Sequence, residues 1–93
     1  MFAVAVSEDG IPGVVARLHD RGYHHVLAEG GPTLAGELLS TGQFDELCLT
    51  TSPLAVAGSG GRILHGEPAT VPLRLAGLLE EDGTLLARWH TGQ

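Results

Sequence analysis

The feature that most restricts the fold is an abrupt change of pattern at two consecutive glycines, Gly30 and Gly31. The run at residues 26–28 just before them is apolar without alternation, which is typical of a strand covered on both faces. Directly after them, helical spacing begins at Pro32 and continues to about Thr41. Proline suits a first helical turn, because its missing N–H is not needed there. The sequence therefore predicts a strand over residues 24–29 that turns at once into a helix.

A further helix and two strands are predicted on either side of this turn. Apolar residues recur at i, i+3, i+4 and i+7 over residues 11–18, which matches the amphipathic helical template, and Gly22 stands where a C-terminal cap glycine is expected. Residues 2–6 have the pattern of a short strand. Another strand is predicted over residues 46–53, continuing towards residue 56.

The last third of the chain predicts a β-hairpin. Residues 71–76 alternate between apolar and other side chains, residues 84–90 form a second strand pattern, and Glu81-Asp82-Gly83 lies between them as a turn. The expected order is strand–helix–strand–helix–strand followed by an antiparallel hairpin. This order predicts one α/β domain over residues 1–93, with a mixed sheet flanked by helices.

The charge and cysteine content exclude several kinds of partner. The formal net charge is −6, with five arginines and no lysine, so no basic face can be assembled for nucleic acid or for an anionic membrane surface. No apolar run approaches the roughly 20 residues of a membrane helix. Cys48 is the single cysteine, which rules out an intrachain disulfide and fits a reducing cytoplasm.

The glycine turn has the properties of an anion site. Glycine allows close backbone approach, and the first N–H groups of a helix are unpaired and point outward. A P-loop would need a lysine after its glycines and the dinucleotide fingerprint needs G-x-G-x-x-G, and neither is present. The residues alone thus favour a phosphate or pyrophosphate ligand and a purely structural turn about equally.

A longer stretch carries a family resemblance. Residues 26–54, VLAEGGPTLAGELLSTGQFDELCLTTSPL, resemble the reductase domain of the bifunctional riboflavin-biosynthesis deaminase–reductase, which belongs to the dihydrofolate-reductase-like superfamily. The matching features are a strand entering Glu-Gly-Gly-Pro-Thr-Leu, a short helix, and Asp-Glu-Leu opening a strand that ends at Pro53. A glycine-rich loop at residues 58–62 also stands where the family has one.

This resemblance implies an activity and a set of site residues. The family reduces the ribosyl side chain of a ribosylaminopyrimidine phosphate with NADPH, as a phosphoribosylaminouracil reductase. Dihydrofolate reduction is a neighbouring activity in the superfamily. By analogy Glu29 would contact the small-molecule substrate. The cofactor would be bound by Gly30, Gly31, Pro32, Thr33, Leu34, Ala35 and Gly36.

The same resemblance implies that the chain corresponds to the C-terminal half of such a domain. The N-terminal half, with further cofactor contacts, is then missing, and the companion deaminase is excluded because its zinc signature needs more than one cysteine. Residues 2–6 would form an exposed edge, which predicts a homo-oligomer. The alternative is a non-catalytic binding or oligomerisation module.

Other reactive residues are expected to be structural. The five histidines show no i, i+4 pair, so no metal site is predicted. Cys48 lies between two leucines in a predicted strand and is expected in the core rather than as a nucleophile. Asp45 and Glu46 are adjacent in a strand pattern and cannot act on one atom together. Arg62 is expected to be solvated, and Trp89 is expected in a core or an interface.

Overall fold

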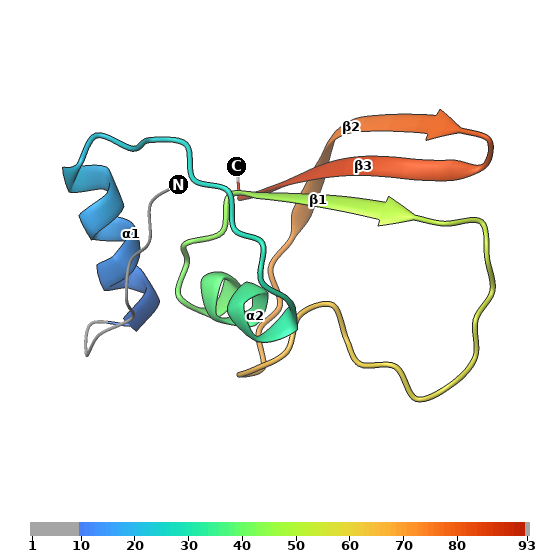
Figure 1. Ribbon diagram of the computed structural model, residues 1–93, viewed down its shortest axis with the longest axis horizontal. Coiled ribbons are helices and arrows are strands. Elements are labelled where there is room, and N and C mark those ends of the chain that lie inside the picture. Colours follow the sequence, from blue (N-terminus) through green and yellow to red (C-terminus); the bar gives the residue numbers. More distant parts are fainter. Residues whose placement is uncertain (1–9, 93) are drawn as a thin grey trace. The chain divides into compact units, whose positions relative to one another are not determined.

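The computed structural model describes residues 10–92. The chain divides into two compact units, residues 1–43 with 62–69 and residues 44–61 with 70–93. Five elements follow one another along it (Figure 1): helices α1 (Gly10–Asp20) and α2 (Pro32–Ser40), then strands β1 (Glu46–Thr51), β2 (Leu73–Glu81) and β3 (Thr84–Thr91). The strand predicted over residues 2–6 lies outside the described residues.

Both predicted helices are confirmed, and each ends in the same type of cap. After α1, Gly22 has a φ of +90° and donates to the His19 carbonyl at 2.9 Å. After α2, Gly42 has a φ of +74° and donates to the Leu39 carbonyl at 3.2 Å. In each case the N–H of the residue after the glycine donates to the carbonyl of the residue one position earlier: Tyr23 to Leu18 and Gln43 to Leu38. The last carbonyls of each helix are therefore satisfied in a Schellman motif. A residue with a Cβ would be strained at both glycines.

The strand predicted over residues 24–29 is wrong. The segment has no strand hydrogen bonding and is exposed throughout, with Leu27 82% exposed. A strand exists only through hydrogen bonds to a neighbouring strand, and none of the described strands pairs with this segment. The apolar run at residues 26–28 is therefore exposed in the described part of the chain.

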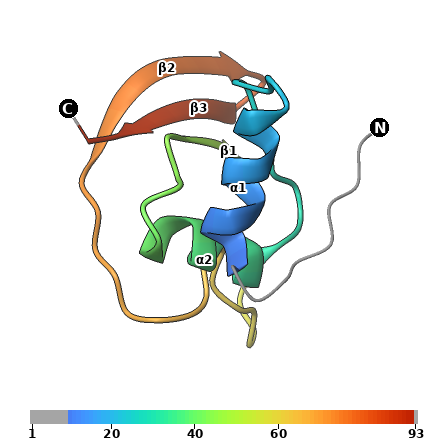
Figure 2. The same cartoon turned by 90° about the vertical axis from the view of Figure 1, so that its left-hand side faces the viewer.

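The second unit is built on a three-stranded sheet with the order β1-β3-β2. Both pairings are antiparallel, and Figures 1 and 2 show β2 and β3 side by side. The predicted hairpin is confirmed. Its two-residue turn has φ values of 50° at Asp82 and 86° at Gly83, the left-handed pair that a tight hairpin requires. Glu80 Oε2 accepts the Gly83 N–H at 2.7 Å.

Two sequence expectations about the sheet need correction. The described sheet is antiparallel throughout rather than mixed, because residues 24–29 supply no strand to it. The first strand ends at Thr51 instead of Pro53. Proline has no N–H to continue a ladder, and the chain has already turned at this point, since Leu54 N–H donates to the Ser52 carbonyl at 2.8 Å.

The sheet has one apolar and one polar face. Strand alternation and the pairing register place a set of largely apolar side chains on the same face, which we call the apolar face: Leu47, Leu49, Leu73, Leu75, Leu78, Leu85, Ala87 and Trp89. The opposite face carries Glu46, Cys48, Arg74, Arg88 and His90 together with Leu79 and Leu86, and we call it the polar face because it holds most of the charged side chains of the sheet. Ala76 is an extra residue, a β-bulge, in the pairing of β2 with β3. Because of the bulge, the side chains of β2 after it lie on the same faces as those of the β3 residues they pair with.

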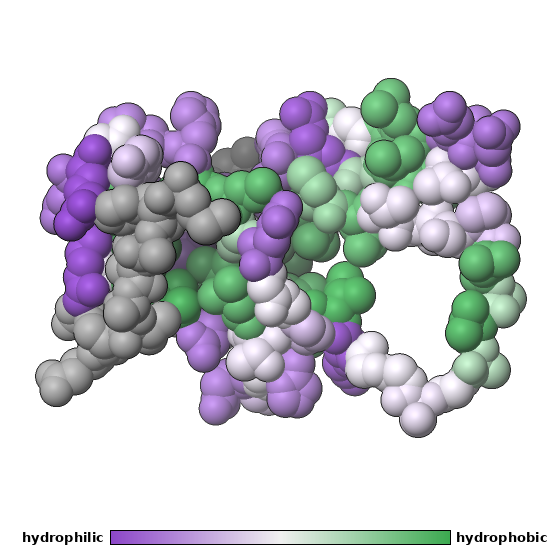
Figure 3. Space-filling model, viewed as in Figure 1, coloured by the Kyte–Doolittle hydropathy of each residue, from purple (hydrophilic) through white to green (hydrophobic). Residues whose placement is uncertain are grey.

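Much of the hydrophobic surface is exposed. Ile11 is the buried hydrophobic side chain of the described residues, at 8% exposure. Leu78 and Leu79 on β2 are 54% and 71% exposed, and Figure 3 shows hydrophobic residues at the surface over the strands. None of the helices within residues 10–92 has the length and apolar character needed to cross a membrane.

Candidate functional site

The turn between residue 29 and α2 has a backbone geometry that only glycine adopts readily. Gly31 is the N-cap of α2, with φ 97° and ψ −175°. This region of the backbone map is essentially restricted to glycine, and other residues are strained there by about 1–3 kcal/mol. The Gly31 carbonyl accepts the first helical hydrogen bond from Ala35 N–H at 3.1 Å. Gly31 therefore sets the direction in which α2 begins.

The N-terminus of α2 presents donors that the helix does not use. Thr33 and Leu34 occupy the first turn, where N–H groups lack an intrahelical acceptor, and no side chain caps the helix. A Cβ placed on Gly31 would meet no atom within 4 Å, so the space in front of this backbone is open. Free N–H groups, a helix dipole and open space together favour an anion such as a phosphate.

Exposure divides the predicted site residues into two groups. Leu34 and Ala35 are half-buried, and Gly36 is buried. The remaining residues are exposed and accessible to a ligand: Glu29, Gly30, Gly31, Pro32 and Thr33. The accessible part of the predicted site is thus the turn itself and the first residues of the helix.

Gly36 has a packing role that the sequence did not reveal. A Cβ at Gly36 would overlap the carbonyl oxygen of His65 and lie 2.7 Å from its carbonyl carbon. The His65 N–H donates to the Pro32 carbonyl at 3.0 Å. The segment around His65 therefore packs against the first turns of α2 and supports the glycine turn. The glycine-rich loop at residues 58–61 precedes this segment, but nothing in its composition indicates where His65 lies.

A second cluster of polar side chains lies on the polar face of the sheet. Glu46 Oε1 is 2.8 Å from His90 Nε2 and 3.6 Å from Arg88 Nε, and the Cys48 thiol donates to Glu46 Oε2 at 3.7 Å. The hydrogen bond with His90 is the main cause of a lowered pKa of the Glu46 carboxyl, and the charge of Arg88 adds to it. No group of three or more potential metal ligands is found within residues 10–92.

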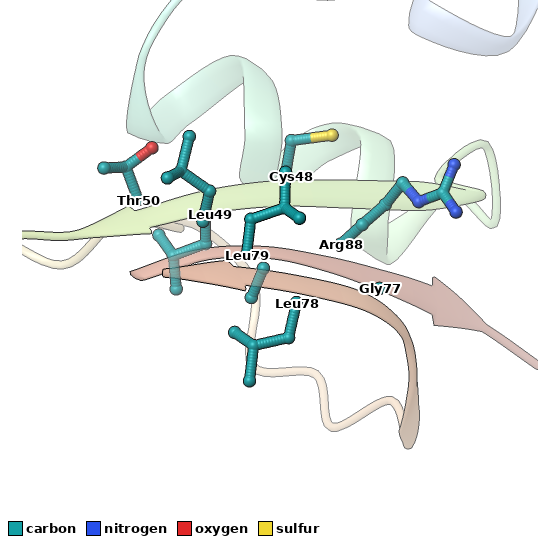
Figure 4. Close-up of a pocket in the computed structure, with 9 residues that line it drawn as sticks. Cys48, Leu49, Thr50, Gly77, Leu78, Leu79 and Arg88 are labelled. Atoms are coloured by element: carbon teal, nitrogen blue, oxygen red, sulfur yellow. The ribbon is translucent and has the colours of Figure 1, made fainter. Parts of the chain in front are cut away.

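The expectation that Cys48 is a core residue is wrong, because its thiol is exposed on the polar face. It borders an open hollow of about 570 Å³ over the middle of the sheet (Figure 4). Gly77 and Arg88 also line the hollow, and the Arg88 guanidinium would lie about 3.5 Å from a Cβ built on Gly77. Alternation along a strand indicates which side chains share a face, but it does not indicate which face is covered.

The lowered pKa of Glu46 predicts that the stability of the sheet depends on pH. A carboxyl with a lowered pKa adds stability above its ordinary pKa, and this stability is lost as the pH falls through the lowered value. We expect the melting temperature to drop on acidification below the ordinary glutamate range near pH 4.5. The drop should be smaller for Glu46→Gln. The difference will be modest, because exposed ion pairs are weak. Thermal melts followed by circular dichroism from pH 3 to pH 7 would measure it, and parallel pH profiles of both chains would contradict the assignment.

Comparison with known proteins gives the family to which the chain belongs. Residues 3–86 match the model of the RibD C-terminal domain, and the chain belongs to this family of riboflavin-biosynthesis reductase domains. Among solved structures, it is similar to a pyrimidine reductase-like protein from Corynebacterium diphtheriae, with a TM-score of 0.82 and 24% sequence identity. The match covers 94% of this chain but only 37% of the other. No curated protein gives a significant match.

Proposed function

We propose that this chain forms the NADPH-contacting part of a riboflavin-pathway reductase, which reduces the ribosyl side chain of a ribosylaminopyrimidine phosphate to its ribityl form. The observation that carries the proposal is the Gly31 turn. Its left-handed φ, the open space in front of it and the unused N–H groups of α2 fit a cofactor phosphate. Several anions would fit this turn, and we choose NADPH because the reductases of this family use it.

The proposed roles of the residues follow from their accessibility. Gly30, Gly31, Pro32 and Thr33 would line the cofactor phosphates, with Thr33 offering both a hydroxyl and an N–H. Leu34, Ala35 and Gly36 would support the same surface from beneath. Glu29, exposed just before the turn, would contact the substrate. NADPH supplies the hydride for the substrate carbon, and the protein positions the two reactants.

A net charge of −6 makes backbone donors the main recognition groups for an anionic cofactor. Neutral N–H groups at a helix N-terminus bind phosphate without needing a basic side chain.

The proposed location of the protein is the cytoplasm. The exposed thiol of Cys48 is suited to this reducing compartment.

We further propose that residues 1–93 are the C-terminal part of a dihydrofolate-reductase-like domain, with a mixed sheet flanked by helices. The exposed apolar residues at 26–28 support this proposal, since a strand pattern without a partner strand is expected when part of a sheet is contributed elsewhere. In the complete domain residues 24–29 would form a strand. The chain would then need the other half of the domain to bind and reduce the pyrimidine.

Calorimetric titration of the purified chain with NADPH, with NADH in parallel, tests the proposed function. We expect saturable binding that favours NADPH. Absence of binding at millimolar NADPH would contradict a working cofactor site in this chain, and the family membership would remain unaffected.

A second candidate function is a non-catalytic binding or oligomerisation module. It is favoured by the exposure of leucines on β2, where Leu78 and Leu79 are more than half exposed. Leu78 shares the apolar face with Leu75, which is 47% exposed, and exposed apolar surface of this kind is typical of an interaction site. Association without any NADPH binding would support this candidate over the reductase.

A further inference from the structure

The hollow over the middle of the sheet is separate from the glycine turn. All of its lining residues belong to the second unit, and its volume of about 570 Å³ is in the range of small-molecule sites. The pairing register places most of the lining residues on the polar face, in two successive rows across the sheet: Cys48, Arg88 and Gly77 in the first row, and Thr50, Leu86 and Leu79 in the second. The hollow is therefore a feature of the polar face.

The first row gives the hollow a positively charged end. Figure 4 shows the side chains of Cys48 and Arg88 projecting from the same side of the sheet. Arg88 Nε lies 3.6 Å from Glu46 Oε1, and the guanidinium lies beside Gly77, which has no side chain to cover it. Within the described part of the chain, the terminal nitrogens of Arg88 have no acceptor. A guanidinium with unused N–H groups is suited to bind a carboxylate through two parallel hydrogen bonds.

The second row gives the hollow an apolar end. Leu79 and Leu86 are partners across β2 and β3, and they are 71% and 43% exposed. Two residues along a strand span about 7 Å, which is the separation between this row and that of Arg88. A ligand with a charged head at Arg88 and an apolar body of this length would cover both leucines. Removing their apolar surface from water is favourable.

The charges around Arg88 favour a singly charged head. Arg74 pairs with His90 in the next row of the same face, and within the described residues Arg74 has no ion-pair partner. The hydrogen bond with His90 lowers the pKa of Glu46, so this carboxyl is ionised at neutral pH. Two guanidiniums beside one carboxylate leave a single positive charge to be balanced. A doubly charged phosphate would be repelled more strongly by Glu46.

We propose that this hollow binds a small carboxylate with an apolar chain, such as a medium-chain fatty acid. The carboxylate accepts hydrogen bonds from the Arg88 guanidinium, and the chain lies over Leu79 and Leu86. The proposal goes beyond the reductase function, because it assigns a ligand to the second unit, whereas the glycine turn belongs to the first.

Alkylation of Cys48 reports whether the hollow is occupied. Cys48 is the single cysteine of the chain, and its exposed thiol borders the hollow. We expect millimolar octanoate to slow alkylation by the neutral reagent iodoacetamide several-fold and in a saturable manner, as measured by mass spectrometry. Octan-1-ol has the same chain without the charge and should protect the thiol about tenfold more weakly. Absence of protection by octanoate, or equal protection by the alcohol, would overturn the proposal.

Substitutions at the two ends of the hollow test how the ligand lies. Arg88→Gln and Leu79→Ser should each raise the octanoate concentration for half-protection by about tenfold. The matched controls are Arg62→Gln, in the first unit, and Leu75→Ser, on the apolar face at 47% exposure. Both controls should leave this concentration unchanged.

Two outcomes of these substitutions contradict the proposed site. An Arg88→Gln chain with unchanged octanoate affinity would overturn the role of the guanidinium. Equal effects of Leu75→Ser and Leu79→Ser would place the octanoate outside the hollow. Circular dichroism of each variant checks that the sheet is intact. These readouts need no cofactor, so they are independent of NADPH binding.

Discussion

A chain carrying Gly36→Val is expected to melt well below the natural chain. The Cβ of the new residue would overlap the His65 carbonyl, and neither backbone can move without separating α2 from the segment that covers it. Overpacking of this kind costs about 1–3 kcal/mol. In a domain of this size, each kcal/mol lowers the melting temperature by about 4–8 °C. Thermal unfolding followed by circular dichroism measures the effect.

Gly36→Ala is the more discriminating variant, because two effects oppose each other. In an exposed helix, replacing glycine by alanine stabilises by about 1 kcal/mol, whereas here the added Cβ overlaps a backbone carbonyl. We expect the overlap to win, so that alanine destabilises. The matched control is Gly60→Ala, where a Cβ meets nothing within 4 Å. A stabilised Gly36→Ala chain would show that His65 does not pack on α2 in solution.

Gly31→Val is expected to weaken NADPH binding by at least about tenfold. Valine is strained at the φ of 97° observed for Gly31, and a β-branched side chain would fill the open space through which a phosphate reaches the helix N–H groups. Calorimetric titration with NADPH compares this variant with the natural chain. Unchanged affinity would mean that the turn is structural only.

Gly22→Val serves as the control for backbone strain. Gly22 has a φ of +90° and equally open space around it, but it caps the C-terminal end of α1. This variant should lose a similar amount of stability and keep its NADPH affinity. Equal losses of affinity in both variants would assign the effect to general destabilisation rather than to the turn.

The sequence predicted those elements whose causes are local. The helical spacing of residues 11–18 and the glycines after each helix determine α1, α2 and their caps. The left-handed Asp82-Gly83 pair determines the hairpin and its register. In each of these cases, the interacting groups lie within a few residues of one another, so the pattern alone contains the interaction.

The failures concern features that depend on distant partners. A strand over residues 24–29 requires a neighbouring strand, which the apolar run itself cannot supply. The exposure of Cys48 depends on what covers the sheet, and alternation gives only the face on which the thiol lies. The role of Gly36 depends on the backbone of His65, which no helical pattern around Gly36 indicates. The glycine turn and the start of α2 could be predicted because they depend on neighbouring residues, whereas the packing of His65 against Gly36 could not.

The division of the chain into two units has a consequence for how it can be shortened. Residues 62–69 belong with residues 1–43, although the strand β1 lies between them in the sequence. The chain therefore crosses from one unit to the other three times, and neither unit is a continuous piece that one cut could release. A chain truncated after residue 43 would keep α2 whole but lose His65, and with it the hydrogen bond to the Pro32 carbonyl. A shortened chain that keeps both the glycine turn and the His65 segment must accordingly be made as a circular permutant or as two co-expressed segments.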